Sequence, residues 1–97
     1  MTTFITLIRY TQQGVKNMQD NPIRLDRARK ALEAAGGELK GFYLTMGQYD
    51  AVVIGDVPND KEYMKTIMTL AAAGTVRTET LRAFTEEESR EIISELP

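Results

Sequence analysis

The sequence predicts an α+β domain with the element order βαββαβ, followed by one more helix at the C-terminus. Four segments rich in β-branched and aromatic residues alternate with two long segments of helical periodicity. The two middle strand segments are separated only by a short turn that contains a glycine, which is typical of a hairpin. With 97 residues and an apolar fraction of 42%, the chain fits one domain over residues 1–97.

The four predicted strands cover residues 4–10, 39–46, 51–57 and 75–84. Each contains several Ile, Val, Thr, Tyr or Phe residues, which fit a pleated surface. Between the second and third strands, Gly47 can adopt a positive φ, so residues 47–50 are expected to form the turn. Together with the helices, these strands predict a ferredoxin-like antiparallel four-stranded sheet.

Local capping signals predict where the helices begin and end. Thr11 is expected to cap a short helical turn, and Asn21 is expected to cap the first long helix, with Pro22 at its first position. Gly36 and Gly37 then end that helix. Its apolar stripe is predicted to contain Leu25, Ala28, Leu32 and Ala35.

The second long helix and the terminal helix both follow capping-box spacings. Asn59 precedes Glu62 by three residues, and Thr85 precedes Glu88 by three. Gly74 ends the second long helix, while the terminal helix carries Ile92, Ile93 and Leu96. The apolar stripe of the second long helix is predicted to contain Tyr63, Ile67, Leu70 and Ala71.

Both faces of the predicted sheet carry large apolar side chains. Right-handed crossovers place the two long helices on one face and leave the other open. An open apolar face of several hundred Å² favours burial, so we expect a homodimer or higher oligomer; the alternative is a monomer whose terminal helix folds over the sheet. Strict alternation divides the side chains of each strand between its two faces. In the first strand one face carries Phe4, Ile8 and Tyr10 and the other carries Ile5 and Leu7. In the second, Leu39 and Tyr43 lie opposite Phe42, Leu44 and Met46, and in the third, Val53 and Val57 lie opposite Val52 and Ile54.

Composition excludes several function classes. The chain has no Cys and no His, so thiolate or histidine catalysis is excluded, and we predict no metal site and no cofactor. A net charge of −2 argues against nucleic acid. The sequence has neither a membrane span nor a signal peptide, so a cytoplasmic location is expected. Residues 1–48 carry 7 basic and 4 acidic side chains (+3), and residues 49–97 carry 5 basic and 10 acidic side chains (−5). A contact between the halves, within or between subunits, can use this asymmetry, or the charges can form two solvated faces, since exposed ion pairs contribute only about 0–1 kcal/mol.

Five polar residues are candidates for a ligand site. Tyr49 and Asp50 can supply a phenol and a carboxylate as an acid/base pair, although the same residues also suit turn formation. On the fourth strand, Arg77 and Thr78 can bind an anion, or they can belong to an ordinary surface strand. Tyr43 completes the set of candidate ligand contacts.

Several short motifs occur in an order that resembles the GYD domain family. They are Thr11-x-x-Gly14, Asn21-Pro22-x-Arg24, Gly47-x-Tyr49-Asp50, Pro58-Asn59-Asp60 and the segment 74–84. The resemblance covers about residues 3–88 and implies a dimeric α/β-barrel arrangement, in which two ferredoxin-like subunits pack sheet to sheet. That wider group includes cofactor-free oxygenases, isomerases and lyases, but the GYD family itself implies no particular activity, and a shared fold does not transfer function.

Three functions are therefore compatible with the sequence. The first is a homo-oligomeric domain that binds a small molecule between sheet and helices. The second is a cofactor-free enzyme that acts on a small hydrophobic substrate, with Tyr49 and Asp50 as the acid/base pair. The third is a structural or regulatory assembly module.

Overall fold

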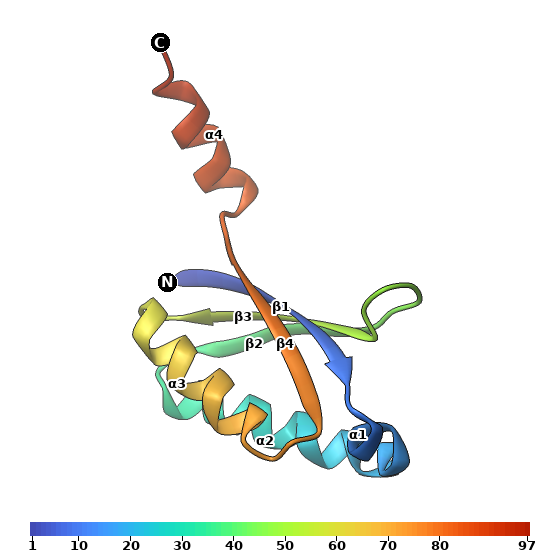
Figure 1. Cartoon of the computed structure of the whole chain (residues 1–97). Helices are drawn as coiled ribbons and strands as arrows, with labels where there is room; N and C mark the ends of the chain where they lie inside the picture. Colours follow the sequence, from blue (N-terminus) through green and yellow to red (C-terminus); the bar gives the residue numbers. More distant parts are fainter.

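The computed structural model describes all residues 1–97 and shows one four-stranded antiparallel sheet. The strands are β1 (Thr2–Tyr10), β2 (Glu38–Leu44), β3 (Ala51–Val57) and β4 (Val76–Ala83), in the order β2-β3-β1-β4 (Figure 1). This is the ferredoxin-like arrangement predicted from the sequence. The strand ends differ from the predicted ones by at most two residues.

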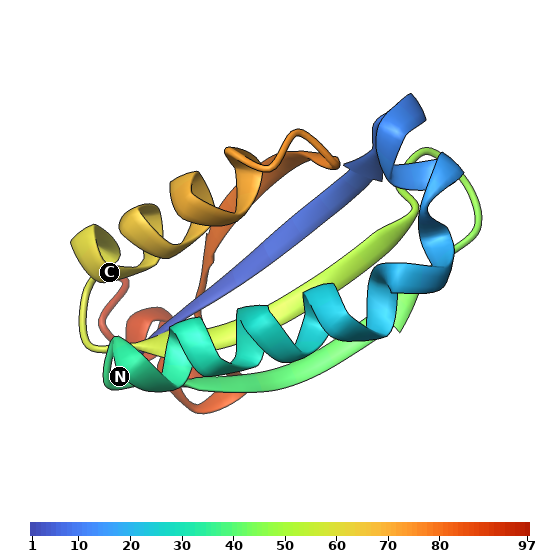
Figure 2. The same ribbon diagram turned by 90° about the horizontal axis from the view of Figure 1, so that it is seen from below.

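Two long helices, α2 (Asn21–Ala34) and α3 (Asp60–Ala71), cover one face of the sheet (Figure 2). A short helix α1 (Gln12–Lys16) and one 3₁₀ turn, η1 (Met18–Asp20), lead into α2. The terminal helix α4 (Glu86–Ser94) lies on the opposite side of the sheet. None of these helices combines the length and the apolar character needed to span a bilayer.

The predicted caps are confirmed with one exception. The side chains of Thr11, Asn59 and Thr85 each accept a backbone N–H of the following helix, and Thr85 and Glu88 form a complete capping box. Asn21, in contrast, is not a cap. It has helical φ and ψ of −57° and −40° and is the first residue of α2, because the preceding 3₁₀ turn runs directly into the helix.

A β-bulge in β2 changes the predicted alternation of side chains. Leu39 pairs with Gly55 and Gly41 pairs with Ile54, so Lys40 is an extra residue without a partner on β3. Leu39 and Phe42 consequently face the helices together, whereas Tyr43 faces the open side. The prediction that Leu39 and Tyr43 share a face is therefore wrong, because strict alternation does not allow for a bulge.

The buried core occupies one end of the layer between sheet and helices. Phe4 stacks on Tyr63 with their ring centroids 4.4 Å apart, and Leu32 and Val57 complete the cluster. Gly55 makes this packing possible, since a Cβ there would lie only 3.1 Å from the Tyr63 ring. The other end of the layer is not filled by side chains.

Candidate functional site

A cavity of about 370 Å³ lies between the sheet and the helices α2 and α3. It continues from the core toward the end of the layer where β1 stops and β4 starts. Strands β1 and β4 provide one wall and the two helices provide the other, so the fold itself positions the site. Its apolar lining is formed largely by Ile8, Leu25, Ala28, Ala31, Leu32, Phe42, Val53, Ile67, Leu70, Ala73 and Val76.

Small side chains on the helices keep the cavity open. Ala28 and Ala31 lie one turn apart on α2, and Ala73 follows the end of α3; all three line the cavity. Alanine favours helix but fills little space. A volume of a few hundred Å³ with a predominantly apolar lining is typical of small-molecule sites.

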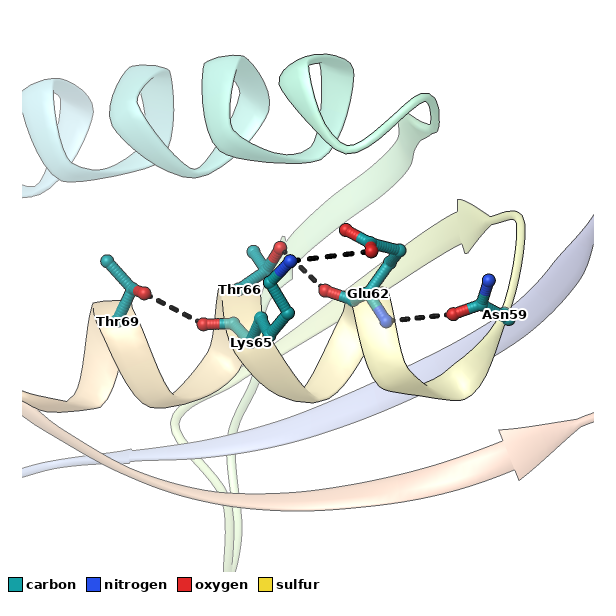
Figure 3. A network of polar contacts seen from close by, with 5 residues as sticks. All are labelled: Asn59, Glu62, Lys65, Thr66 and Thr69. Carbon is teal, nitrogen blue, oxygen red and sulfur yellow. Dashed lines mark hydrogen bonds and ion pairs between the residues drawn. The ribbon is translucent and has the colours of Figure 1, made fainter.

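The α3 wall is less polar than its sequence suggests. Thr66 and Thr69 both line the cavity, but their hydroxyls donate to the carbonyls of Glu62 and Lys65 one turn earlier, at 3.1 and 2.8 Å (Figure 3). Figure 3 also shows that Asn59 caps this helix and that Lys65 pairs with Glu62. The hydrogens of these hydroxyls are already donated within α3, so the helix offers the cavity apolar surface and no free hydroxyl donor from Thr66 or Thr69.

A chain of hydroxyls lies where the cavity meets the core. The Tyr63 hydroxyl is 2.5 Å from the Thr6 hydroxyl, which is 3.3 Å from that of Thr80. Burial raises the pKa of the Tyr63 phenol, and the hydrogen bond with Thr6 partly offsets that rise. The phenol therefore stays neutral at physiological pH.

Most of the remaining polar groups gather at the far end of the cavity. Tyr10, Asn21, Arg24, Thr75 and Thr78 line this end. The Arg24 guanidinium donates to the carbonyls of Gly14 and Asn17, at 3.3 and 2.6 Å, which holds α2 against α1.

Residues at or near this polar end shift the pKa of the Tyr10 phenol. Burial raises its pKa, whereas the hydrogen bond with Asn21 and the charge of Arg24 lower it and the charge of Asp50 raises it. The end of the cavity thus offers a neutral phenol beside a guanidinium. Such a combination suits a ligand oxygen that accepts hydrogen bonds.

Of the five candidate residues, only Thr78 lines the cavity. Arg77 pairs with Arg9 on the open face, and Tyr43 is 61% exposed on that face. The Tyr49 hydroxyl donates to Glu79 at 2.7 Å, and this hydrogen bond raises the pKa of the Tyr49 phenol.

Asp50 forms hydrogen bonds to the backbone of β1 at the end of the hairpin. Its carboxylate accepts the N–H of Tyr10 at 2.9 Å, and its own N–H donates to the carbonyl of Ile8 at 2.8 Å. Tyr49 and Asp50 therefore have separate partners, Glu79 and Tyr10. The structure does not bring the five candidates together in one place.

Tyr10, Asn21 and Arg24 line the cavity although they are not among the five candidates. The alternation within β1 already places Tyr10 on the side of Phe4. The fixed phase of α2 places Arg24 next to Leu25 and Ala28. What the sequence does not reveal is that the core leaves this end of the layer between sheet and helices unfilled. That gap depends on the packing of elements that are distant in sequence.

The molecule is thus a small antiparallel α+β protein with one covered sheet face, one open face and a cavity on the covered side. A sequence model of the GYD domain matches residues 4–93, and the chain belongs to the GYD domain family. The family resemblance predicted from the motifs is confirmed.

One curated relative is 31% identical over 84 residues, which are 86% of this chain and 88% of the relative. It is the glutamine synthetase and cystathionine beta-lyase binding protein of Thermus thermophilus. The match covers nearly the whole length of both chains.

Two solved structures share the fold. FFRP-DM1 has a TM-score of 0.61 at 17% identity, covering 87% of this chain and 100% of that one. TTHA0845 from Thermus thermophilus has a TM-score of 0.56 at 24% identity, covering 88% of this chain and 95% of that one. These likenesses concern the fold alone.

Proposed function

We propose that this protein is a homo-oligomeric domain that binds a small molecule in the cavity between the sheet and the helices α2 and α3. The observation that carries the proposal is the unfilled cavity of about 370 Å³ in a layer that is otherwise packed. Protein interiors are normally close-packed. An opening of this size with polar groups at one end fits a ligand better than a packing defect.

The lining defines the chemistry of the ligand. Its body is apolar, because alanines and branched side chains surround most of the volume. Its polar end carries an acceptor oxygen, such as a carboxylate or carbonyl, that faces Tyr10 and Arg24. Thr78 remains a proposed ligand contact, since it lines the same end.

The proposed oligomer uses the open face of the sheet. Ile5 and Leu7 pair with Ile54 and Val52 on β3, which places all four on the side without helices. On the same face, Leu81 is 45% exposed. Sheet-to-sheet packing with a second copy would remove this apolar surface from water. Tyr43, Tyr49 and Arg77 then become proposed interface residues.

A cavity-filling variant tests the ligand proposal. Ala31→Phe places a ring in the cavity, and Ala34→Phe is the matched control, because Ala34 lies on the same helix but is exposed and does not line the cavity. Native mass spectrometry of protein purified from its own host should show a bound small molecule in the wild type and in Ala34→Phe. Ala31→Phe should lose it.

Two results would overturn the ligand proposal. One is bare wild-type protein that also shows no thermal stabilisation by a panel of small apolar carboxylates and carbonyl compounds. The other is a ligand that Ala31→Phe retains as well as the wild type does.

The named relative favours a second candidate function, binding to a metabolic enzyme. That relative is described as binding glutamine synthetase and cystathionine beta-lyase, and the alignment covers 86% of this chain. The test is sedimentation of this protein mixed with each of the two enzymes from its own host. A complex with either enzyme supports the second function, and independent sedimentation with both enzymes rules it out.

A further inference from the structure

Helix α4 stands apart from the rest of its own chain. It rises on the side of the sheet opposite to α2 and α3 (Figures 1 and 2). Its hydrogen bonds and its one ion pair, Arg90 with Glu86, all remain within the segment that starts at Thr85. Ile92, Ile93 and Leu96 are 46%, 60% and 64% exposed.

Such a helix needs a surface to pack against. α4 has nine residues, and isolated helices shorter than about 12–15 residues are marginal in water. The Thr85 capping box helps to start the helix but does not cover its apolar stripe. Helix α4 ends at Ser94, so the expectation that it also carries Leu96 is not met, and Leu96 follows the helix by two residues. The apolar stripe of Ile92 and Ile93, continued by Leu96, therefore points to an interaction outside the fold of one chain.

The charge of α4 narrows the choice of surface. Between Glu86 and Glu95 the segment carries five glutamates and one arginine, a net charge of −4. On the open face of the sheet, Arg9 of β1 pairs directly with Arg77 of β4. Like charges at directly opposite positions destabilise a sheet. Arg9 donates to the carbonyl of Gln48 at 2.9 Å and lies over the Tyr49 ring, but neither arginine forms an ion pair with a carboxylate in its own chain.

The two charged features lie at opposite ends of the sheet. α4 follows the end of β4 at Ala83, which pairs with Thr3, whereas Arg77 is the second residue of the same strand and pairs with Arg9. A two-fold axis that lies between two facing sheets and runs across their strands reverses one sheet end for end. The Arg9–Arg77 end of the second copy then faces the end from which α4 rises.

We propose that α4 is an arm that docks against the Arg9–Arg77 end of a second copy, while the arm of that copy docks in the same way on the first. This proposal rests on the self-association proposed above and adds the orientation of the two copies. The arm flanks the partner because it rises on the side where the partner sits. Its glutamates supply the carboxylates that the paired arginines lack.

Single-cysteine variants test the arm directly, because the chain contains no cysteine of its own. Ile92→Cys reports on the apolar stripe, and Glu87→Cys is the matched control, about 140° away around the helix. Each full-length variant is reacted with a thiol reagent at concentrations below and above its dimerisation midpoint, which sedimentation gives independently. In the dimer, Ile92→Cys should react about tenfold more slowly than in the monomer, and Glu87→Cys should react equally in both.

A charge exchange tests the docking position. Arg77→Glu should weaken the dimer about tenfold, and Glu91→Lys combined with Glu95→Lys on the same chain should restore most of that loss. Glu91 and Glu95 flank one edge of the stripe, whereas Glu87→Lys on the far side of the helix should restore nothing.

The outcomes of these experiments distinguish a failure of the proposed arm from a failure of the proposed self-association. If the protein dimerises but Ile92→Cys stays fully reactive, or if it is already protected in the monomer, the arm is overturned and the self-association stands. If the thiol is protected but the charge exchange restores nothing, the position at the Arg9–Arg77 end is overturned. If no dimer forms at any concentration, both proposals fail.

Discussion

The hydroxyl of Tyr63 on α3 lies 2.5 Å from the hydroxyl of Thr6 at the centre of β1. Both residues are almost completely buried, at 2% and 1% exposure, and they join a helix to the sheet across 57 residues of sequence. The Tyr63 ring also stacks on Phe4. One side chain therefore links the core, the helix layer and the inner end of the cavity.

Tyr63→Phe should lower the free energy of unfolding by about 1–2 kcal/mol, because it removes the buried hydroxyl and keeps the ring. Tyr63→Ala should cost about 3–5 kcal/mol, since the stacking on Phe4 is lost as well. Urea denaturation followed by circular dichroism measures both. Tyr43→Phe, which changes a tyrosine that is 61% exposed in the single chain, is the control and should leave stability unchanged when all variants are unfolded below the dimerisation midpoint. An equal loss in that variant would contradict this account.

Stability should fall in alkaline solution because of the same residue. Burial holds the pKa of Tyr63 above its ordinary value of 10.0 in the folded protein. The unfolded chain then loses this proton first, so the stabilisation is complete below pH 10 and is lost as the pH rises above it. Urea midpoints at pH 8 and at about pH 11 should differ less in Tyr63→Phe than in the wild type. Equal alkaline losses would show that Tyr63 is not the group responsible.

A charged residue on the open face should break the proposed dimer without unfolding the chain. Ile54→Lys places an ammonium among Ile5, Leu7 and Val52, and the dissociation constant should rise by about a hundredfold or more. Analytical ultracentrifugation measures the change, and circular dichroism checks the fold. Val15→Lys, at a 58% exposed position on α1, should leave the dimer intact. A dimer that survives Ile54→Lys would place the contact elsewhere.

Two glycines should respond very differently to alanine. At Gly14 a Cβ would lie 2.1 Å from the carbonyl oxygen of Thr75, so Gly14→Ala must push α1 away from the start of β4 and should cost about 3 kcal/mol or more. Gly47 has a φ of +110° but no atom within 4 Å of the added Cβ. Gly47→Ala should therefore cost only the backbone strain, about 1–2 kcal/mol. Similar losses in thermal or urea melts of the two variants would contradict the close approach at Gly14.

Most of the fold could be predicted because its signals are local. Thr11, Asn59 and Thr85 are side-chain caps that act within four residues. Gly36 and Gly47 have the positive φ that their positions require. The alternation in β1 correctly places Phe4 and Tyr10 on the helix side. The caps and the alternation depend only on nearby residues.

The candidate site could not be predicted to the same extent because it depends on packing between distant elements. The cavity exists because α2 presents Ala28 and Ala31 to a part of the sheet that the Phe4–Tyr63 pair does not reach. Its polar end combines Tyr10 with Arg24 from different elements. Tyr49 and Asp50 suggest an acid/base pair by adjacency, but each finds a partner on another strand or strand end.

The bulge at Lys40 leaves the two halves of β2 out of phase with each other. Leu39 before it and Phe42 after it both point at the helices, which strict alternation forbids. If the same residues paired regularly, without the bulge, Tyr43 and every later side chain of the strand would turn over. The cavity would then exchange the apolar Phe42 ring for a phenol, and the open face would exchange the phenol for Phe42. The one unpaired residue at Lys40 therefore decides both what lines the cavity and what the open face presents to another subunit.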